Sequence, residues 1–204
     1  MATPVRAVFW DLGGVILRTE DQTPRRLWER RLGLPEGALA EIVFDGEAAR
    51  RAVLGRATAD DVWQEVGARL ALSPPEAARL RADFFSADQI DEALMTFIRH
   101  LARRVQVGMI SNAWPEVGPL VRETWRIADA FEPLILSAEV GLAKPDPRIF
   151  QLALSRAGVD AGQAVFVDDF EENLAAARGV GMLAVPFRDS VQAREAVAAL
   201  LERG

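Results

Sequence analysis

The sequence predicts an α/β fold: a parallel sheet with helices on both faces, interrupted by an inserted helical cap. Two observations predict this fold. Short apolar runs alternate with segments of helical periodicity at the start of the chain and after residue 90, as in a parallel sheet covered on both faces. Between these parts lies a stretch of about 70 residues with helical periodicity and no convincing strand.

The predicted strands are short and apolar. The first, residues 6–10, ends at Asp11 and is followed by Gly13 and Gly14, an order that indicates a buried strand delivering an acid to a tight turn. Similar apolar runs are residues 105–110, 134–136, 164–167 and 183–185. The helical patterns between and after them are residues 91–104, 115–124, 147–157, 171–180 and 191–202.

The inserted stretch has apolar positions that suit helices packing on one another, with proline, glycine and serine between them. The positions expected to pack are Leu27, Leu32, Val62, Trp63, Val66, Leu70, Leu80 and Phe84. We therefore expect a core domain made of residues 1–16 and 90–204, and a helical cap made of residues 17–89.

The composition excludes several kinds of chemistry. With 204 residues, 50% of them apolar, the chain can bury one sizeable core. It has no Cys, which excludes a disulfide framework, a thiolate zinc site and a cysteine nucleophile. Its single His, His100, is expected near the end of a helix, where a positive charge interacts favourably with the helix dipole. This structural role is favoured over that of a catalytic base.

The charge and hydropathy predict a cytoplasmic protein with no nucleic acid or membrane partner. The net charge of -6 argues against duplex nucleic acid, and no apolar run approaches the roughly 20 residues of a membrane helix. The N-terminus lacks the order of a secretion signal. Seven arginines in the first third are expected on solvated helix faces: Arg25, Arg26, Arg30, Arg31, Arg50, Arg51 and Arg56. The oligomeric state stays open.

The use of lysine points to one position. Every basic residue but one is Arg, and the exception is Lys144, in a turn-forming run at residues 141–147. A compact ammonium fits a place where a planar guanidinium does not. A buried phosphate pocket is such a place.

Polar residues follow the predicted strands. In parallel α/β sheets ligands bind outside the carboxyl ends of the strands. The residues at these ends, with the lysine of one crossover, are Asp11, Ser111, Asn112, Lys144, Asp168 and Asp169. Carboxylates, a hydroxyl at a helix start and a lysine predict a site for Mg²⁺ and a phosphate. Each of these segments also has a purely structural interpretation: a turn after Asp11, an N-cap at Ser111 and Asn112, and an acidic helix start at Asp168 and Asp169.

The chain resembles the haloacid dehalogenase superfamily, specifically its phosphatases with a small helical cap. It is similar to sugar-1-phosphate phosphatases and to the phosphatase domain of soluble epoxide hydrolase. Four segments, in the order of that family, carry the resemblance: residues 8–15, residues 110–112, residues 141–150, and residues 165–169 with Asn173, Ala176 and Ala177. The resemblance implies a Rossmann-like core and a small phosphorylated substrate.

The resemblance also implies a role for each site residue. Asp11 would attack phosphorus and become a transient aspartyl-phosphate. Ser111 and the backbone around Asn112 would bind the phosphoryl oxygens, and Lys144 would neutralise charge. The ligands implied for Mg²⁺ are the Asp11 carboxylate, the Gly13 carbonyl, Asp169, and Asp168 directly or through water.

The sequence departs from this family at Gly13. Most phosphatases of the superfamily carry a second Asp there, which protonates the leaving oxygen. Such a group typically supplies about 10²–10⁴ in rate. We expect substrates whose leaving group needs little protonation, namely sugar 1-phosphates, acyl phosphates or aryl phosphates. A cap acid such as Asp45, Glu47 or Asp60 is an alternative source of the proton.

Two other functions stay open. The first is a 2-haloacid dehalogenase; against it, the chain has no Tyr, the residue such enzymes carry two positions after the nucleophile, and it has the paired acids Asp168 and Asp169. The second is a catalytically impaired relative with a binding or regulatory role, for which Gly13 is the main argument. The residue Trp114 has two readings, as a stacking platform for substrate and as a packing residue.

Overall fold

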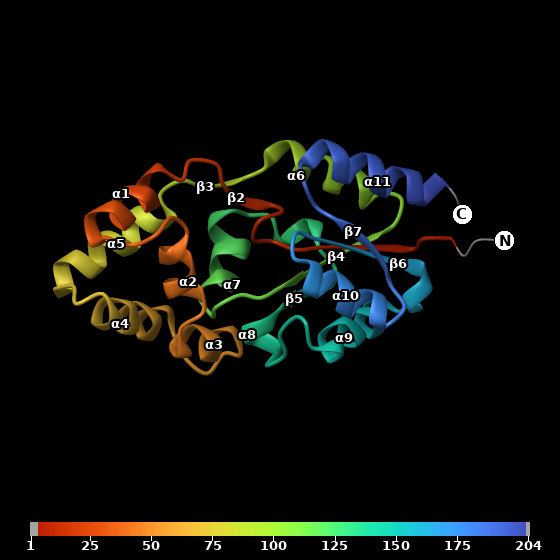
Figure 1. Cartoon of the computed structure of the whole chain (residues 1–204). Coiled ribbons are helices and arrows are strands. Elements are labelled where there is room, and N and C mark those ends of the chain that lie inside the picture. The colour runs from red at the N-terminus through yellow and green to blue at the C-terminus, as the bar shows by residue number, and fades with distance from the viewer. Residues whose placement is uncertain (1–3, 203–204) are drawn as a thin grey trace.

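The computed structural model describes residues 4–202 and confirms the α/β class. Five parallel strands form one sheet in the order β5-β4-β1-β6-β7, so the first strand is central. The strands are β1 (Ala7–Trp10), β4 (Gln106–Ser111), β5 (Leu134–Leu136), β6 (Ala164–Asp168) and β7 (Leu183–Pro186). Their carboxyl ends point toward a group of helices at the far end of the molecule (Figure 1).

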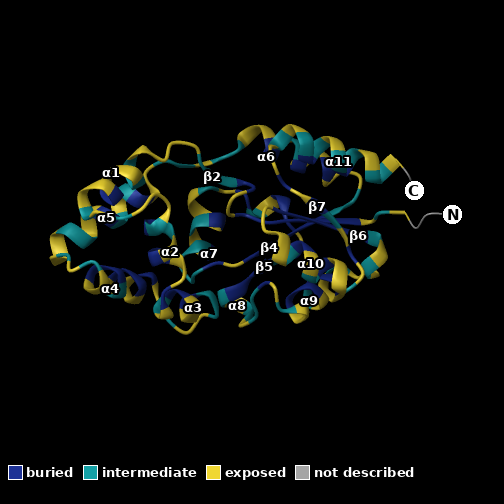
Figure 2. Ribbon diagram, in the orientation of Figure 1, coloured by how far each residue is buried: buried dark blue, intermediate teal, exposed yellow. Residues whose placement is uncertain are grey.

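Helices cover both faces of this sheet because its side chains alternate between two apolar clusters. Val8 and Trp10 of β1 pack on one face with residues of α6 (Glu92–Leu101) and α11 (Ser190–Glu202). Ala7 and Phe9 pack on the other face with α9 (Pro147–Ala157) and α10 (Glu171–Gly179). The buried strands and the exposed outer sides of the helices are visible in Figure 2.

The segments after β4 and β5 are irregular. The pattern at residues 115–124 predicted one α-helix. The structure has a short helix α7 (Val117–Pro119) that continues as a π-helix, Leu120–Thr124. The remaining short elements are the 3₁₀ turns Ala128–Ala130 and Ala161–Gln163, and α8 (Ser137–Val140).

Between residues 19 and 88, where the sequence predicted a helical stretch, lie five helices, which we call the helical insertion. They are α1 (Thr23–Leu32), α2 (Ala38–Phe44), α3 (Glu47–Val53), α4 (Ala59–Arg69) and α5 (Pro74–Phe85). They have their own apolar cluster, which includes Trp63, Leu80 and Phe84. The exact boundaries of the core domain (1–16 and 90–204) and the cap (17–89) stay a prediction.

Two sequence-based expectations for this segment were wrong. The stretch was expected to lack strands, but β2 (Leu17–Thr19) pairs antiparallel with β3 (Asp88–Ile90) where the chain enters and leaves the insertion. Three-residue strands are too short to show alternation. Leu27 was expected to pack, yet it is 53% exposed while its neighbour Trp28 is buried, because adjacent residues on a helix point in different directions.

The arginines of the first third are mostly exposed, with one exception that corrects the expectation of solvated faces. The Arg25 side chain is 13% exposed, lies 3.0 Å from Asp88 and sits 4.0 Å above the Phe84 ring. His100 is exposed in the last turn of α6, as predicted. Among residues 4–202, no helix is long and apolar enough to cross a membrane.

Gly108 provides a test of the strand packing. It pairs with Phe9 of β1, and an added Cβ would lie 2.6 Å from Phe9 Cδ1 and 3.0 Å from the Pro133 carbonyl oxygen. We expect Gly108→Ala to lower the free energy of unfolding, measured by urea titration, by about 1–3 kcal/mol, because the added methyl group would overpack the core. Gly162→Ala is the control, since its Cβ would meet nothing within 4 Å. An equal loss in both variants would contradict this packing argument.

Candidate active site

Asp11 lies directly after the central strand β1. All four residues of β1 are buried, because strands flank it on both sides and helices cover both faces. The Asp11 backbone N–H donates to the Val167 carbonyl at 2.9 Å, and the Leu12 N–H donates to Asp11 Oδ1 at 2.7 Å. These bonds fix the carboxylate at the sheet edge, in a residue that is only 6% exposed.

The ammonium of Lys144 lies between two carboxylates. Its Nζ is 2.7 Å from Asp11 Oδ1 and 2.7 Å from Asp168 Oδ2. All three residues are buried. A buried charge is tolerated when it is paired and hydrogen-bonded, so each of these groups depends on the others. The structure thus brings together three residues that are far apart in the sequence, as predicted.

Ser111 and Asn112 lie at the end of β4, the strand beside β1. Ser111 is buried. The Asn112 side chain makes two bonds to the backbone of Lys144: its amide donates to the Lys144 carbonyl at 2.9 Å, and its Oδ1 accepts from the Lys144 N–H at 2.8 Å. Sequence reasoning placed Asn112 near the phosphate but missed that its side chain anchors the lysine segment.

Asp168 and Asp169 are adjacent, yet their surroundings differ. The oxygens of Asp168 accept bonds from the Phe170 N–H at 2.8 Å, from Asn173 Nδ2 at 3.1 Å and from Lys144. Asp168 is therefore held by three neighbouring donors, whereas the Asp169 side chain is exposed. Asn173 was part of the family pattern, but its bond to Asp168 was not foreseen; the five-residue spacing into a helix start was the available signal.

Burial dominates the titration of two of these carboxyls. It raises the pKa of Asp11 from 3.8 to about 7; Lys144 lowers this pKa and Asp168 raises it further. Asp169 has an exposed surface, but its neighbours still desolvate the carboxyl; this desolvation, and then the charge of Asp168, raise the pKa of Asp169. The site therefore has more negative charge than its one lysine neutralises. It favours an added cation.

The three carboxyls fit a hard divalent cation such as Mg²⁺. One oxygen each from Asp11, Asp168 and Asp169 lies within 4.8 Å of the others. Carboxylate and carbonyl oxygens are the ligands this ion prefers. Gly14 shapes the same place: with φ +76°, an added Cβ would lie 2.2 Å from Asp169 Oδ2. The close approach of Asp169 to this turn requires a glycine.

Gly13 differs from Gly14. A Cβ added at Gly13 would meet nothing within 4 Å, and its φ is not in the left-handed region. Beside Asp11 there is thus open space. Most phosphatases of the superfamily that this sequence resembles carry a carboxylic acid at this position. The missing side chain is not forced by the fold.

The helical insertion contacts the core next to Ser111. The Ala59 N–H of α4 donates to Glu116 Oε1 at 2.9 Å, and the Trp114 ring packs 5.8 Å from the Phe44 ring, centroid to centroid. The packing role of Trp114 is therefore observed. Neither contact places the cap acids Asp45, Glu47 or Asp60 over Asp11, so their role stays a prediction.

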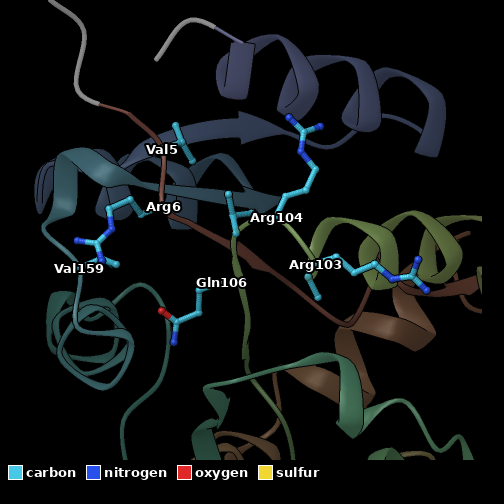
Figure 3. Close-up of a pocket in the computed structure, with 8 residues that line it drawn as sticks. Val5, Arg6, Arg103, Arg104, Gln106 and Val159 are labelled. Atoms are coloured by element: carbon cyan, nitrogen blue, oxygen red, sulfur yellow. The ribbon is translucent and has the colours of Figure 1, made fainter.

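A separate hollow of about 450 Å³ lies at the opposite edge of the sheet, around the amino ends of the strands (Figure 3). Its lining includes Arg6, Arg103, Arg104 and Gln106. It contains none of the residues described above.

A family model confirms what this geometry indicates. The model for haloacid dehalogenase-like hydrolases matches residues 5–181. The chain belongs to this family. It is a hydrolase, as predicted, and the match spans β1, the helical insertion, Lys144 and the paired acids.

Three known proteins are similar to this chain over most of its length. The sesquiterpene phosphatase of Aspergillus oryzae is 26% identical over 94% of this chain and 94% of its own length. Bifunctional epoxide hydrolase 2 of Sus scrofa is 27% identical over 91% of this chain, which spans 37% of that longer protein. A Bacteroides thetaiotaomicron enzyme of the family, solved with magnesium and inorganic phosphate, has a TM-score of 0.70 at 20% identity, covering 90% and 94% of the two chains.

The raised pKa of Asp11 predicts a pH-dependent stability. Between its unfolded value of 3.8 and about 7, the folded protein retains a proton that the unfolded chain releases, so stability falls as pH rises through this window. In the presence of a chelator, we expect the free energy of unfolding to fall from pH 5 to pH 8 by on the order of 2 kcal/mol more in the wild type than in Asp11→Asn. Urea titrations at both pH values measure this difference.

The matched control is Asp129→Asn, which removes an exposed carboxylate on the core. It should follow the wild type at both pH values. If the free energy of unfolding had the same pH dependence in the wild type and in Asp11→Asn, this would contradict the argument that burial raises the pKa of Asp11.

Proposed function

We propose that the protein is a Mg²⁺-dependent phosphatase acting on a small phosphorylated molecule through an aspartyl-phosphate on Asp11. The observation that supports this most is the buried arrangement of Asp11, Lys144 and Asp168, with 2.7 Å between the ammonium and each carboxylate. A lysine paired with a carboxylate beside an anion site stabilises the charge that develops when phosphoryl is transferred.

In the proposed reaction a carboxylate oxygen of Asp11 forms a bond to phosphorus while the bond from phosphorus to the leaving oxygen breaks. Ser111 and the backbone N–H groups after β4 bind phosphoryl oxygens. Lys144 keeps its position through Asp168 and Asn112 and neutralises charge on the phosphoryl group. Water then hydrolyses the aspartyl-phosphate and restores the Asp11 carboxylate.

Asp11, the Gly13 carbonyl and Asp169 are the proposed ligands of Mg²⁺, with Asp168 contributing directly or through water. When bound, the ion supplies positive charge that offsets the repulsion between the carboxylates and a phosphate dianion. The clustered carboxyls and the raised pKa of Asp169 support this proposal. The magnesium and phosphate in the Bacteroides thetaiotaomicron enzyme support it by analogy.

Two alternatives have less support. A 2-haloacid dehalogenase needs no metal, whereas the three clustered carboxyls here favour one. A catalytically impaired binding protein would not need a carboxylate that is positioned as a nucleophile and paired with a buried lysine. The open space at Gly13 favours substrates whose leaving group needs little protonation, including sugar 1-phosphates.

The proposal predicts Mg²⁺-dependent hydrolysis of p-nitrophenyl phosphate. We expect Asp11→Asn to lower kcat at least about 10³-fold, because the nucleophile is lost. Asp169→Asn should lower the response to Mg²⁺. Full activity in the presence of a chelator would contradict the metal requirement.

Thermal unfolding gives an independent reading of the metal site. Mg²⁺ at 100 times its Kd should stabilise the wild type by about 2.7 kcal/mol. The Asp169→Asn variant should show a smaller shift at the same concentration. Turnover that is absent from folded protein despite a clear Mg²⁺ shift would favour the binding protein over the phosphatase.

The open space at Gly13 allows a gain-of-function test. Gly13→Asp should raise hydrolysis of simple alkyl phosphates by about 10²-fold, because a general acid protonates the poor leaving group and the added side chain has room. Gly13→Ala fills the same space without an acid and is the matched control. Steady-state rates with ethyl phosphate measure the effect; equal rates in the three proteins would contradict the missing-acid explanation.

A further inference from the structure

Three aromatic rings form a surface where the helical insertion meets the core, and we call Phe44, Phe85 and Trp114 the aromatic face. The Trp114 ring lies 5.8 Å from the Phe44 ring and 6.5 Å from the Phe85 ring, centroid to centroid. Phe44 is 45% exposed and Phe85 is 37% exposed. Large rings left open to solvent at a junction of two elements are typical of a binding surface.

The aromatic face is continuous with the candidate active site through the chain. Trp114 is the third residue after Ser111, in the loop that leaves β4 at the edge where Asp11 lies. Phe44 and Phe85 end helices α2 and α5 of the helical insertion, toward which the carboxyl ends of the strands point (Figure 1). The loop after β4 therefore joins Ser111, the proposed phosphate contact, to the first of these rings.

A buried ring supports the exposed ones. Phe84 is 1% exposed and contacts Phe44 and Phe85 edge to face, at 5.6 Å and 4.9 Å between centroids. The Arg25 guanidinium lies over the Phe84 ring and bonds to the Phe84 carbonyl. The aromatic face is thus a fixed platform, which binds a flat apolar group at a small cost in conformational entropy.

We propose that the substrate is an aryl phosphate, with the aromatic leaving group bound by the aromatic face. This inference rests on the proposed phosphatase function and names its substrate class. Two independent features support it. The open space at Gly13 favours a leaving group that departs without a general acid, and a phenol, with a pKa of about 10, does so far more readily than an alcohol, whose pKa is nearer the 15.7 of water. Among the three side chains of the aromatic face, the Trp114 indole N–H is the one hydrogen-bonding group, whereas a sugar offers several hydroxyls that need partners.

The proposed reaction balances. An Asp11 oxygen forms the bond to phosphorus, the bond from phosphorus to the aryl oxygen breaks, and the phenolate leaves with the electron pair. Water then releases inorganic phosphate from Asp11. The phenolate takes the proton that hydrolysis sets free, so no further reactant is needed.

The first experiment compares four substrates with wild-type protein and Mg²⁺ by release of inorganic phosphate. They are phenyl phosphate, 2-naphthyl phosphate, 2-phenylethyl phosphate and glucose 1-phosphate. We expect kcat/KM for 2-naphthyl phosphate to exceed that for phenyl phosphate by about tenfold, because the larger ring covers more apolar surface. We expect 2-phenylethyl phosphate, an apolar alkyl ester, to be at least about tenfold slower than phenyl phosphate.

Variants then assign the preference to the aromatic face. Phe85→Ala and Phe44→Ala should each remove most of the advantage of 2-naphthyl over phenyl phosphate, mainly through KM. Phe85→Tyr keeps a ring and should retain the advantage. Leu27→Ala is the matched control, because Leu27 is an exposed apolar residue of the helical insertion that is not one of the three rings. Because Phe44 is the more exposed ring, its variant keeps the test valid if Phe85→Ala unfolds.

The outcomes separate this inference from the proposed function. Turnover of glucose 1-phosphate equal to or above that of the aryl esters, or an aryl preference unchanged in both Ala variants, would overturn the aryl phosphate proposal while leaving a phosphatase. No turnover of any of the four substrates by folded, Mg²⁺-loaded protein would overturn the phosphatase itself.

Discussion

The contact of the Lys144 ammonium with two buried carboxylates is the interaction on which the rest of the site depends. Its partners come from strands β1 and β6, which are neighbours in the sheet, and the lysine comes from a crossover. Removing one partner would leave an uncompensated buried charge, a loss that typically costs about 3–5 kcal/mol. The bonds of Asn112 to the lysine backbone, and of Asn173 to Asp168, serve the same contact.

The contact with Lys144 explains why two adjacent acids, Asp168 and Asp169, have different surroundings. Asp168 uses its oxygens to bind Lys144, Asn173 and the Phe170 N–H. Its neighbour Asp169 is left exposed. Two adjacent acids thus have different surroundings: Asp168 holds the Lys144 ammonium, whereas Asp169 is exposed and, in the proposed metal site, would bind Mg²⁺. A raised pKa at Asp11 is the electrostatic cost of collecting these groups away from water.

The sequence predicted the sheet and the site because both follow from one rule. Strands buried on both faces read as short apolar runs, and their carboxyl ends meet at one edge. Asp11, Ser111 and Asp168 could therefore be grouped at that edge, and Lys144, which lies in a crossover, was added because it is the one lysine of the sequence. The pairing of β2 with β3 was missed because it joins residues far apart through strands too short to show a pattern. Leu27 was misplaced since helical periodicity does not fix the rotation of a helix within one residue.

The side-chain hydrogen bonds could not be predicted from the sequence, because an Asn after a strand can equally be an N-cap. Only the structure shows that the Asn112 side chain bonds to the backbone of Lys144.

The two adjacent glycines after β1 separate what the fold requires from what the chemistry selects. Gly14 has a positive φ, and any Cβ there would collide with the Asp169 carboxylate, so its identity follows from the turn and from the close approach of Asp169. Gly13 has neither constraint. The fold therefore leaves position 13 free, whereas it fixes position 14. In the proposed phosphatase, a site with a nucleophile, a lysine and paired acids but no acid at position 13 would rely on the substrate for an easy departure of the leaving group. The residues proposed to select such a substrate lie in the helical insertion and in the loop after Ser111, outside the buried cluster of Asp11, Lys144 and Asp168.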